Sequence, residues 1–354
     1  MSNFDATVSD RLALEEAYAG RKPYHGELHD HTNSGGTSDG AVPLADYKTE
    51  MLAKHMDFAA ILDHRQVWHM YLPEFDRNLF ICGTEPGTSI TDAVAEKKSL
   101  HYNMLFPGTG YIEKFLEQFP EYEFTGGIEG HFKYPSFTHE EFGKIIDAVI
   151  ALGGFFVIPH PKQVMYADDP LQYWFRDWTG LEVFYNDLDC ESTRDDYALW
   201  VRLLDMDKRI WACAGGDKHE HPDTGALTTI YSDRQYGDAY LPYLKQGDFT
   251  AGNAGIRMIL GDVRQGGHCA FAGKRLVVAA SDYHETVRFA DHKYRLCVMD
   301  DRGVVCQCDA DIDGIACLAL DADPSARWYR AEIFDDTTGV RIAVGNPIWN
   351  DERA

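Results

Sequence analysis

Positive charge is scarce in this sequence of 354 residues. Lys and Arg together number 33 against 57 Asp and Glu, which gives a formal net charge of −24 at pH 7. Nucleic acids and anionic membranes require a basic footprint on the protein that binds them. We therefore expect neither as a partner. An anionic ligand is compatible with this charge only where local cations, such as bound metal ions, overcome the acidic field.

Long apolar runs, disulfide patterns and targeting signals are also missing. The longest apolar run, residues 148–158, is shorter than the about 20 residues that a membrane-spanning helix needs. The eight cysteines are scattered, and the pair Cys306 and Cys308 has no second pair that would complete a zinc site. The sequence does not open with a basic and then apolar signal peptide. These absences predict a soluble, cytoplasmic protein, and they leave its oligomeric state open.

What is present is an ample apolar core. A hydrophobic fraction of 45 % is typical of a globular chain, and the length suffices for a barrel and a smaller domain. Residues 1–22 have the pattern of a helical lead-in that ends near Gly20. Residues 23–262 alternate short apolar runs with helical patterns, and this alternation predicts parallel strands joined by crossover helices.

The expected helices and strands can be placed by their patterns. Residues 45–55, 140–152 and 195–205 read as helices, and each precedes an apolar run that reads as a strand: 58–62, 155–158 and 210–214. After residue 262 the sequence pattern changes to that of short strands separated by turns rich in Asp and Gly. We expect a small antiparallel β-sandwich domain over residues 263–354.

Histidines and acids recur where the short apolar runs end. His29 and His31 lie one residue apart, so at the end of an extended strand both side chains point to the same face. The pattern returns at His64, Glu85, His160 and in the segment from Asp217 to His219. Ligands at the carboxyl ends of several strands are how an α/β barrel assembles a site.

Nine residues of the barrel region are therefore candidate metal ligands. They are His29, His31, Asp39, His64, Glu85, His101, His160, Asp217 and His219. Nitrogen and oxygen donors of this kind suit Zn, Mn or Fe. Nine ligands exceed the needs of one ion, so they favour two or three divalent ions with a bridging carboxylate such as Glu85. Sites of this kind activate a water molecule and hold a phosphoryl oxygen.

The order of these motifs resembles that of the polymerase and histidinol phosphatase (PHP) superfamily. The motifs are His29-Asp30-His31-Thr32, Ser38-Asp39-Gly40, Asp63-His64, Gly83-Thr84-Glu85, His101, His160-Pro161 and Gly215-Gly216-Asp217-Lys218-His219. The resemblance covers roughly residues 24–262. It implies an α/β fold with a distorted, TIM-like (β/α)7 barrel, followed here by the β-sandwich, and a trinuclear metal site that hydrolyses phosphoesters.

The resemblance also implies a division of the ligands. His29, His31, Glu85 and Asp217 would hold one ion, Glu85 with His101 and His160 a second, and Asp39, His64 and His219 a third. The implied reaction is hydrolysis of a small-molecule phosphate monoester or diester by a hydroxide that bridges two metal ions. Glu85, Asp217 and His219 are the expected catalytic residues, and His219 or a nearby acid would protonate the leaving oxygen.

Two departures from the family pattern stand near the first motifs. The segment between His31 and Ser38 is a few residues longer than usual, which affects Asp39. After His64 the chain has Arg65 where the family more often has an acid. An arginine there could bind a phosphate oxygen in bidentate fashion or lie at the surface. Further candidate substrate contacts, each in a loop or just after a ligand, are His131, Lys133 and Lys162.

Two other functions are compatible with the sequence. A zinc amidohydrolase also opens with His-x-His and has a late Asp, but it usually adds a bridging lysine, and Lys162 is the nearest candidate here. A metal-bound protein without catalytic activity is the second alternative. The intact ligand set argues against that alternative, because loss of catalysis usually removes ligands.

Overall fold

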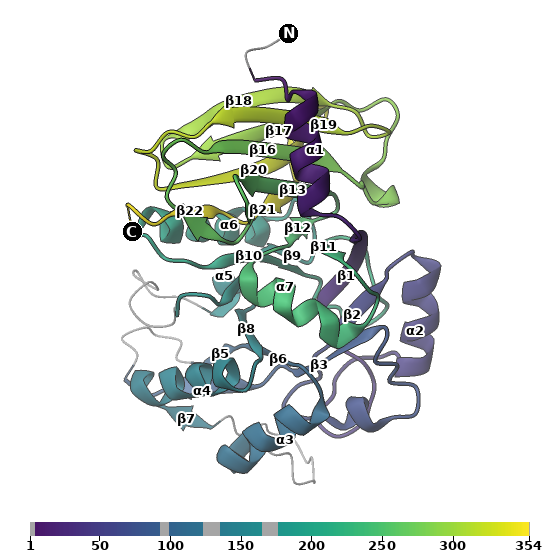
Figure 1. Ribbon diagram of the computed structural model, residues 1–354. Coiled ribbons are helices and arrows are strands. Elements are labelled where there is room, and N and C mark those ends of the chain that lie inside the picture. Colours follow the sequence, from purple (N-terminus) through teal and green to yellow (C-terminus); the bar gives the residue numbers. More distant parts are fainter. Residues whose placement is uncertain (1–3, 93–98, 123–134, 165–175, 354) are drawn as a thin grey trace. The chain divides into compact units, whose positions relative to one another are not determined.

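The structure, a computed structural model, describes residues 4–92, 99–122, 135–164 and 176–353. The fold is mixed α/β (Figure 1). The chain forms two compact units. The central unit comprises Gly26–Ala226 and Gln235–Lys245, and the terminal unit comprises Met1–His25, Leu227–Arg234 and Gln246–Ala354. The domain boundaries expected from the sequence, 1–22, 23–262 and 263–354, stay a prediction.

The central unit alternates strands and helices along much of its length. Its strands are β1 (Lys22–Asp30, whose first residues belong to the terminal unit), β2 (Phe58–Ile61), β3 (Phe80–Thr84), β4 (Gly87–Ile90), β5 (Ser99–His101), β6 (Asn103–Phe106), β7 (Ser136–Phe137), β8 (Phe155–Ile158), β9 (Gly180–Tyr185) and β10 (Trp211–Gly215). Its helices are α2 (Leu44–Ala53), α3 (Thr109–Gln118), α4 (His139–Ala151), α5 (Pro161–Val164), α6 (Glu191–Asp205) and α7 (Leu241–Gln246), with 3-10 turns η1 (Trp68–Tyr71), η2 (Pro120–Tyr122) and η4 (Gly237–Tyr240).

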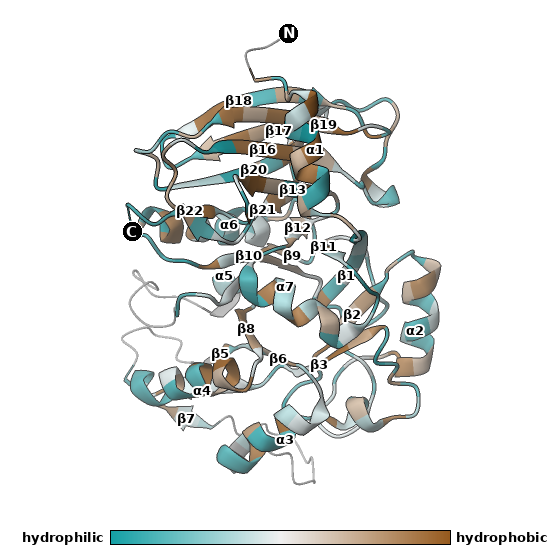
Figure 2. Cartoon of the chain, viewed as in Figure 1, coloured by the Kyte–Doolittle hydropathy of each residue, from teal (hydrophilic) through white to brown (hydrophobic). Residues whose placement is uncertain are grey.

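Seven strands of this unit follow one another in the order β10-β9-β8-β6-β3-β2-β1. The strands β2 and β8 are buried along their whole length and apolar throughout, as expected of strands that are covered on both faces. Figure 2 shows β8 in the brown of hydrophobic residues, whereas α3 and α4 carry many teal, hydrophilic residues. An isolated parallel bridge between Asp30 and Lys218 joins the ends of β1 and β10. The seven-stranded barrel itself stays a prediction.

The expectation of uniformly parallel strands does not hold for β6. This strand pairs antiparallel with both β3 and β8, whereas β1, β2 and β3 pair in parallel, as do β8, β9 and β10. A parallel connection needs a crossover of a dozen or more residues, usually a helix. The described residues between β3 and β6 contain no helix. Instead β4 pairs antiparallel with β5, and Tyr102 alone separates β5 from β6.

Local sequence explains where the helices start. A capping box begins α4: the Thr138 hydroxyl accepts the N–H of Glu141 at 3.3 Å, and the Glu141 carboxylate accepts the N–H of Thr138 at 2.8 Å. Helix α6 begins four residues before the predicted start. Its cap is Cys190, whose Sγ accepts the N–H of Thr193 at 3.4 Å. Cysteine is outside the usual set of N-cap residues, so the sequence pattern did not predict this start.

The terminal unit contains the antiparallel strands expected after residue 262. Its elements are α1 (Val8–Ala17), β11 (Thr228–Ser232), β12 (Thr250–Gly252), β13 (Gly255–Leu260), β14 (Val263–Arg264), β15 (His268–Cys269), β16 (Arg275–Ser281), η5 (Glu285–Val287), β17 (Tyr294–Asp300), β18 (Gly303–Ala310), β19 (Ala316–Asp321), β20 (Trp328–Asp335), β21 (Val340–Gly345) and β22 (Ile348–Asn350). One sheet has the order β14-β13-β16-β19, and the order β11-β12-β21-β20-β17-β18 forms another run. The β-sandwich arrangement stays a prediction.

The predicted N-terminal helix is present as α1, and it begins with a capping box of Thr7 and Asp10. Leu14 of α1 and Tyr18 just after it pack into a buried cluster with Ile259 of β13 and Val277 of β16. Figure 1 shows α1 lying across these strands. Burial of such side chains contributes roughly 1.5–3 kcal/mol each. No helix within the described ranges is long and apolar enough to cross a membrane.

Candidate metal centre

The candidate ligands lie where strands of the central unit end. His29 belongs to β1 and His31 follows it, Glu85 comes directly after β3, and His101 is the last residue of β5. The remaining candidates follow strands within a few residues: His64 follows β2, His160 follows β8, and Asp217 and His219 follow β10. Because neighbouring parallel strands end at the same edge, side chains at their carboxyl ends meet there.

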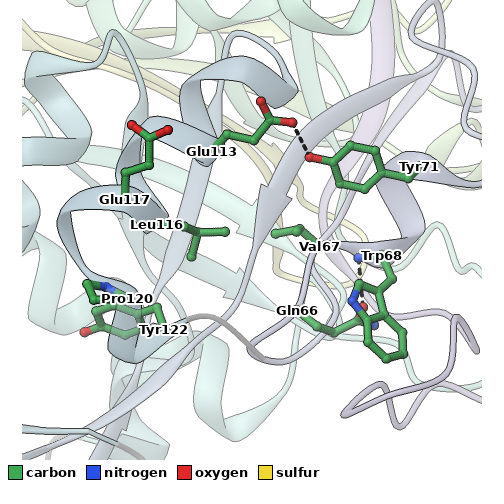
Figure 3. Close-up of a pocket in the computed structure, with 9 residues that line it drawn as sticks. All are labelled: Gln66, Val67, Trp68, Tyr71, Glu113, Leu116, Glu117, Pro120 and Tyr122. Atoms are coloured by element: carbon green, nitrogen blue, oxygen red, sulfur yellow. Dashed lines mark hydrogen bonds between the residues drawn. The ribbon is translucent and has the colours of Figure 1, made fainter. Parts of the chain in front are cut away.

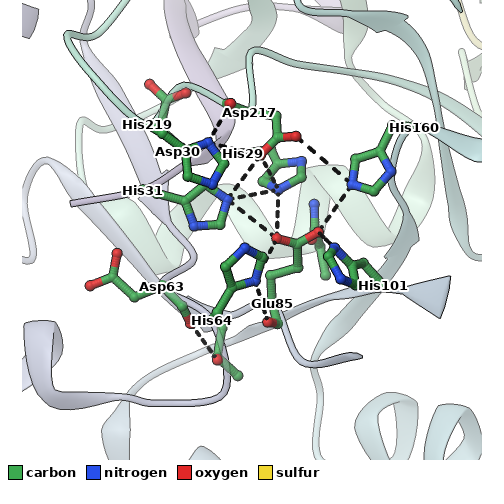
Figure 4. Close-up of polar contacts among 12 residues, drawn as sticks. His29, Asp30, His31, Asp63, His64, Glu85, His101, His160, Asp217 and His219 are labelled. Carbon is green, nitrogen blue, oxygen red and sulfur yellow. Dashed lines mark hydrogen bonds and ion pairs between the residues drawn. The ribbon is translucent and has the colours of Figure 1, made fainter. Parts of the chain in front are cut away.

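Glu85 lies in the middle of the cluster, and its carboxylate is fully buried. Five histidines surround it, as Figure 4 shows. The nitrogen–oxygen distances are 3.2 Å for His29 Nε2, 3.2 Å for His31 Nε2, 3.1 Å for His64 Nδ1, 3.3 Å for His101 Nδ1 and 3.2 Å for His160 Nε2. The first three reach Oε2 and the last two reach Oε1, so the two oxygens of one carboxylate face two groups of histidines.

Asp217 contacts the same histidines from the opposite side. Its Oδ1 lies 3.0 Å from Nε2 of His31 and 3.4 Å from Nε2 of His29. Its Oδ2 accepts a hydrogen bond from the Tyr185 hydroxyl at 3.0 Å and lies 3.9 Å from Nε2 of His160. Two carboxylates therefore enclose the space that the imidazole nitrogens of His29 and His31 face.

Asp39 reaches the cluster in spite of the longer segment before it. Its carboxylate lies 3.3 Å from Nε2 of His219 and 3.6 Å from Nε2 of His64, with 47 % of the side chain exposed. Two backbone hydrogen bonds hold the segment, from Asn33 to Val42 at 2.8 Å and from Ala41 to His219 at 2.6 Å. The added residues form a turn, which leaves Asp39 beside the two histidines.

Three groups of candidate ligands have donor atoms that all lie within 4.8 Å of one another. These are His29, His31, Glu85 and Asp217; then His64, Glu85 and His101; and then His31, Asp39, His64 and His219. The first group is the one that the resemblance implied for the first ion. The other two groups differ from the implied division, because both contain His64 and the one with Asp39 and His219 also contains His31. His160 joins the second group through Glu85 Oε1.

The hydrogen bonds of two histidines indicate which nitrogen faces the cluster. The Nδ1 of His29 lies 2.8 Å from Glu182 Oε1, and the Nδ1 of His219 lies 3.0 Å from the backbone oxygen of Asp217. An Nδ1–H that donates to these oxygens leaves Nε2 toward the cluster. Metal-binding histidines are oriented in this way, with the second nitrogen held by a carboxylate or carbonyl.

Unpaired oxygens in the cluster also fit a cation. Glu85 Oε2 and Asp217 Oδ1 are buried and have no hydrogen-bond partner among the described residues, although imidazole nitrogens lie 3.0–3.4 Å away. A buried carboxylate oxygen without a partner is costly. The His29 and His31 Nε2 atoms themselves lie 3.3 Å apart. A divalent ion between these atoms would satisfy the nitrogens and the oxygens together, so the residues present fit the metal site predicted from the sequence.

The pKa shifts of Glu85 and His31 indicate that protons on the histidines balance the carboxylate charge when no ion is bound. Burial acts to raise the pKa of Glu85, but the surrounding histidines, His29 first, hold it well below its usual range. Burial acts to lower the pKa of His31, but the carboxylates of Asp217 and Glu85 outweigh it and raise the pKa to about 10. Protons on the imidazoles thus balance the carboxylates, and metal binding would release them.

Backbone strain gathers at the same place. His160, Asp217 and Arg65 have φ values of +32°, +51° and +51°, in the left-handed region that residues other than glycine seldom adopt. Such a conformation costs roughly 1–3 kcal/mol per residue and persists where the surrounding structure enforces it. Its occurrence at two candidate ligands and at the residue after a third is typical of a functional site.

Buried acids support the ligands from behind. Glu182 of β9 accepts from His29 and also accepts the backbone N–H of His160 at 2.8 Å, so it orients two ligands at once. Asp63 accepts the N–H of Thr32 at 2.7 Å, and its Oδ2 lies 3.3 Å from Nδ1 of His69. These contacts fix the backbone on both sides of His31 and His64.

The expected substrate contacts are distributed differently. Arg65 is half-buried directly after His64, and its N–H donates to the Glu85 carbonyl at 3.2 Å. The Lys162 ammonium lies 2.8 Å from Glu191 and 2.5 Å from Asp195, so two acids of α6 already hold it. His131 and Lys133 lie outside the described residues.

Sequence reasoning gave no role to several residues that the fold brings to the centre. Tyr185 ends β9 and donates to Asp217, and its ring meets the ring of His160 edge to face at 5.3 Å. Its strand-end position was the available signal, since the ligands share it. His69 lies in the 3-10 turn η1, where no local pattern indicates a partner for Asp63.

A cavity of about 550 Å³ adjoins the segment that follows His64. Figure 3 shows its lining: Gln66, Val67, Trp68, Tyr71, Glu113, Leu116, Glu117, Pro120 and Tyr122. The Tyr71 hydroxyl donates to Glu113 at 2.6 Å across it. Gln66 connects the cavity to the centre, because its amide nitrogen lies 3.3 Å from Asp63 Oδ2. The size is within the usual range of small-molecule pockets, about 300–1,000 Å³.

No protein-family model matches the chain, and no curated protein matches its sequence. Several solved structures are similar at 14–16 % identity. An amidohydrolase from Chromobacterium violaceum has a TM-score of 0.38 over 55 % of this chain and 87 % of its own. A candidate metal-dependent phosphoesterase from Bifidobacterium adolescentis has a TM-score of 0.37. That match covers 62 % of this chain and 94 % of the phosphoesterase.

A lesion-specific endonuclease from Pyrococcus furiosus has a TM-score of 0.43, covering 63 % of this chain and 56 % of the endonuclease. This chain thus spans little more than half of that protein. Endonuclease Q is also among the similar structures in complex with a 27-mer duplex substrate, at a TM-score of 0.42. The expectation that nucleic acid is excluded as a partner is therefore wrong. Whole-chain charge does not decide the matter, because bound metal ions dominate the local field of such a site.

The phosphoesterase and the endonuclease agree with the resemblance to the PHP superfamily that the motifs carry. At these TM-scores the agreement adds no argument of its own. The resemblance rests on the ordered motifs from His29 to His219 and on their meeting at one centre.

Proposed function

We propose that the protein is a metal-dependent phosphoesterase that hydrolyses a phosphate ester of a small molecule. The observation that carries this proposal is the convergence of nine histidines and carboxylates on one centre, with Glu85 shared between two groups of ligands. Nine ligands exceed the four to six that one ion uses, so we propose two or three divalent ions. Nitrogen and oxygen donors without a thiolate favour Zn, Mn or Fe.

We also propose that strands β1, β2, β3, β6, β8, β9 and β10 form the distorted barrel expected from the sequence. The bridge between Asp30 and Lys218 supports this proposal, because it joins the two strands at opposite ends of the strand order. In a barrel the ligands after β1, β2, β3, β8 and β10 lie on the catalytic face.

When bound, the ions lower the pKa of water toward neutrality and offset the negative charge of the phosphoryl group. His29 and His31 present their Nε2 atoms toward this position, and Glu182 keeps His29 in that orientation. Asp217, held by Tyr185, closes the position on the other side. The protein thereby offers a preorganised site whose geometry does not have to form during the reaction.

His219 is the proposed proton donor in a form with two ions. Its side chain is 36 % exposed, more than the other histidines of the cluster, so it can reach the leaving oxygen. The hydrogen bond with Asp39 raises the pKa of His219, which favours the protonated form that a proton donor needs. In a form with three ions, His219 is a ligand together with Asp39 and His64.

The cavity beside His64 is the proposed place for the organic part of the ester. Its lining combines the aromatic rings of Trp68 and Tyr71 with polar groups of Gln66 and Glu113. Arg65 is the proposed phosphate contact. In sequence it lies between the candidate ligand His64 and Gln66, which lines the cavity. A guanidinium matches the geometry of a phosphate oxygen pair.

The test combines metal analysis with hydrolysis assays. Purified protein should contain two or three equivalents of Fe, Mn or Zn and hydrolyse an aryl phosphate monoester or the bis-aryl diester in a chelator-sensitive way. The variant Glu85→Gln should lose metal and activity together, and the exposed control Glu140→Gln should lose neither. Metal-loaded protein that is inactive on every ester would contradict the proposal. Cleavage of a short DNA duplex in preference to the small esters would identify the substrate as a nucleic acid.

Amide hydrolysis is the alternative, favoured by the similarity to an amidohydrolase. Lys162, the bridging lysine that the sequence offered, is held by Glu191 and Asp195. This pairing counts against the alternative. Turnover of an amide or lactam substrate without phosphoesterase activity would establish it.

A further inference from the structure

The terminal unit contains a second cavity, of about 440 Å³. Its floor comprises Tyr18 after α1, Tyr231 of β11, Arg257 of β13 and Ser281 of β16. None of the nine candidate ligands lines it. The floor is buried and polar, whereas the mouth carries exposed charged side chains such as Glu15 and Arg288.

Arg257 is the central feature of this floor. Its side chain is only 9 % exposed, and its guanidinium lies 6.0 Å from the ring centre of Tyr18 and 5.7 Å from that of Tyr231. Two cation–π contacts hold it in place. Its Nε is buried and has no hydrogen-bond partner in the described part of the chain. A buried charged donor without an acceptor costs about 1–3 kcal/mol or more, so its presence requires an explanation.

The acid that pairs with Arg257 is a weak partner. Glu15 lies 2.9 Å from the Nη1 of Arg257, but 56 % of its side chain is exposed. At the mouth, Asp313 pairs with Arg288 and is 73 % exposed. Exposed ion pairs contribute roughly 0–1 kcal/mol, because water screens them and both side chains lose freedom. A ligand anion can therefore replace either acid at small cost.

The half-buried acid of the cavity, Asp282, already has hydrogen-bond partners. Asp282 Oδ2 accepts hydrogen bonds from the hydroxyls of Tyr231 and Ser281, both at 2.6 Å. Its φ of +53° is in the left-handed region, so the backbone is held in an uncommon conformation to place this carboxylate. These two hydroxyls are thereby committed to Asp282.

A second donor in the lining lacks a partner. The Tyr283 hydroxyl is buried and has no hydrogen-bond partner among the described residues. Arg257 and Tyr283 thus offer two buried donors for which the described residues supply no acceptor. A ligand that fits these two donors must therefore supply a hydrogen-bond acceptor. Beside a guanidinium, the favoured acceptor is an anionic oxygen.

We propose that this cavity of the terminal unit binds a small organic oxyanion, a carboxylate or a phosphate, with Arg257 and Tyr283 as its donors. Arg288 at the mouth adds a second positive charge. The site shares no lining residue with the candidate metal ligands, and the proposal gives it no part in the hydrolysis. Its volume, within the usual range of about 300–1,000 Å³, suits a metabolite-sized molecule.

Calorimetric titration of the full chain tests this proposal, with inorganic phosphate, citrate and glucose as the probes. Because phosphate also binds metal centres, each titration is repeated in the Glu85→Gln variant. We expect saturable binding of phosphate or citrate that persists in Glu85→Gln, and no binding of glucose. The probe that binds more tightly identifies the ligand as a phosphate or a carboxylate.

The variant Arg257→Met should weaken this binding by ~10-fold or more. Because Arg257 also packs between two tyrosines, Tyr283→Phe provides a milder test. It removes a hydroxyl without a partner and so leaves folding intact, and it should weaken binding several-fold. The control Arg295→Lys, at a half-buried arginine that pairs with Asp336, should bind as the parent chain does. Absence of binding by both anions, preference for glucose, or anion binding unchanged in Tyr283→Phe and Arg288→Gln would each overturn the proposal.

Discussion

The Nδ1 atom of His29 lies 2.8 Å from Oε1 of Glu182, and both side chains are buried. This contact reaches from β9 back to β1 and fixes the imidazole so that Nε2 faces Glu85. Carboxylates that hold a metal-binding histidine in this way set its tautomer and raise its basicity. Glu182 is consequently as important to the centre as a ligand, although it does not face the ion position.

Substitution of Glu182 tests this relationship. The variant Glu182→Gln keeps an oxygen that accepts from His29 but removes the charge, so we expect metal affinity to fall by ~10- to 100-fold. Competition with a chelator of known affinity measures the change. Glu191→Gln, an exposed acid of the same unit, is the control and should bind metal normally. Equal affinities in the two variants would show that Glu182 only fills space.

The position of Asp39 depends on the close packing of Gly40. A Cβ atom at Gly40 would lie 2.6 Å from the backbone of Thr32, closer than real contacts allow. We expect Gly40→Ala to displace Asp39 from His219 and His64, and the protein to lose one of its metal ions while the group around Glu85 keeps its own. Metal analysis counts the ions.

The control for this prediction is Gly110→Ala in α3, where a Cβ meets nothing within 4 Å. That variant should keep the metal content of the parent chain. Unchanged metal content in Gly40→Ala would mean that Asp39 holds no ion.

Tyr185 is expected to position Asp217 and not to bind metal. In Tyr185→Phe the hydrogen bond of 3.0 Å to Asp217 Oδ2 is lost while the ring contact with His160 remains. We expect kcat to fall by ~10-fold, about 1.4 kcal/mol, with metal content unchanged. Steady-state kinetics with an aryl phosphate and metal analysis measure the two effects. Tyr111→Phe on α3 should change neither, and a loss of metal in Tyr185→Phe would contradict the assigned role.

Stability should depend on pH through Asp196 of α6. Burial raises the pKa of Asp196 to about 8, whereas in the unfolded chain it is about 3.9. The folded protein therefore holds this proton more tightly, so its stabilising effect is complete below pH ~4 and is lost as the pH rises toward 8. The loss is on the order of a few kcal/mol.

Asp196→Asn removes this titration and keeps an oxygen for the N–H of Lys162, which Asp196 accepts at 2.7 Å. We expect the difference in Tm between pH 5 and pH 8 to be smaller in this variant than in the parent chain. Glu140→Gln, an exposed acid of α4, should leave the difference unchanged. An equally large difference in Asp196→Asn would assign the pH dependence to other groups.

Much of the candidate site followed from the sequence because its ligands obey a local rule. A histidine or acid directly after a short apolar run lies at the end of a strand, and strand ends meet at one edge. Seven of the nine candidates follow this rule, whereas Asp39 and His101 came from the order of the motifs, and all nine lie at one centre. Glu182 lies within β9, so the rule does not find it. Nor does the rule find Asp196, since it lies within a helical pattern and only packing buries it.

The sequence by itself determined the order of the candidate ligands, the alternation of strands with helices, and the presence of antiparallel strands toward the C-terminus, which in the structure already begin with β11 to β13, before residue 262. These properties can be inferred from residue types and from the hydrophobic periods of two residues for strands and 3.6 residues for helices, which follow from local geometry. Tertiary structure decided the reversed direction of β6, the turn that brings Asp39 to His219, and the orientation of the His29 ring by Glu182. It also decided that the buried Nε of Arg257 has no acceptor among the described residues. Each of these depends on contacts between residues far apart in the chain, whose distances no local pattern encodes.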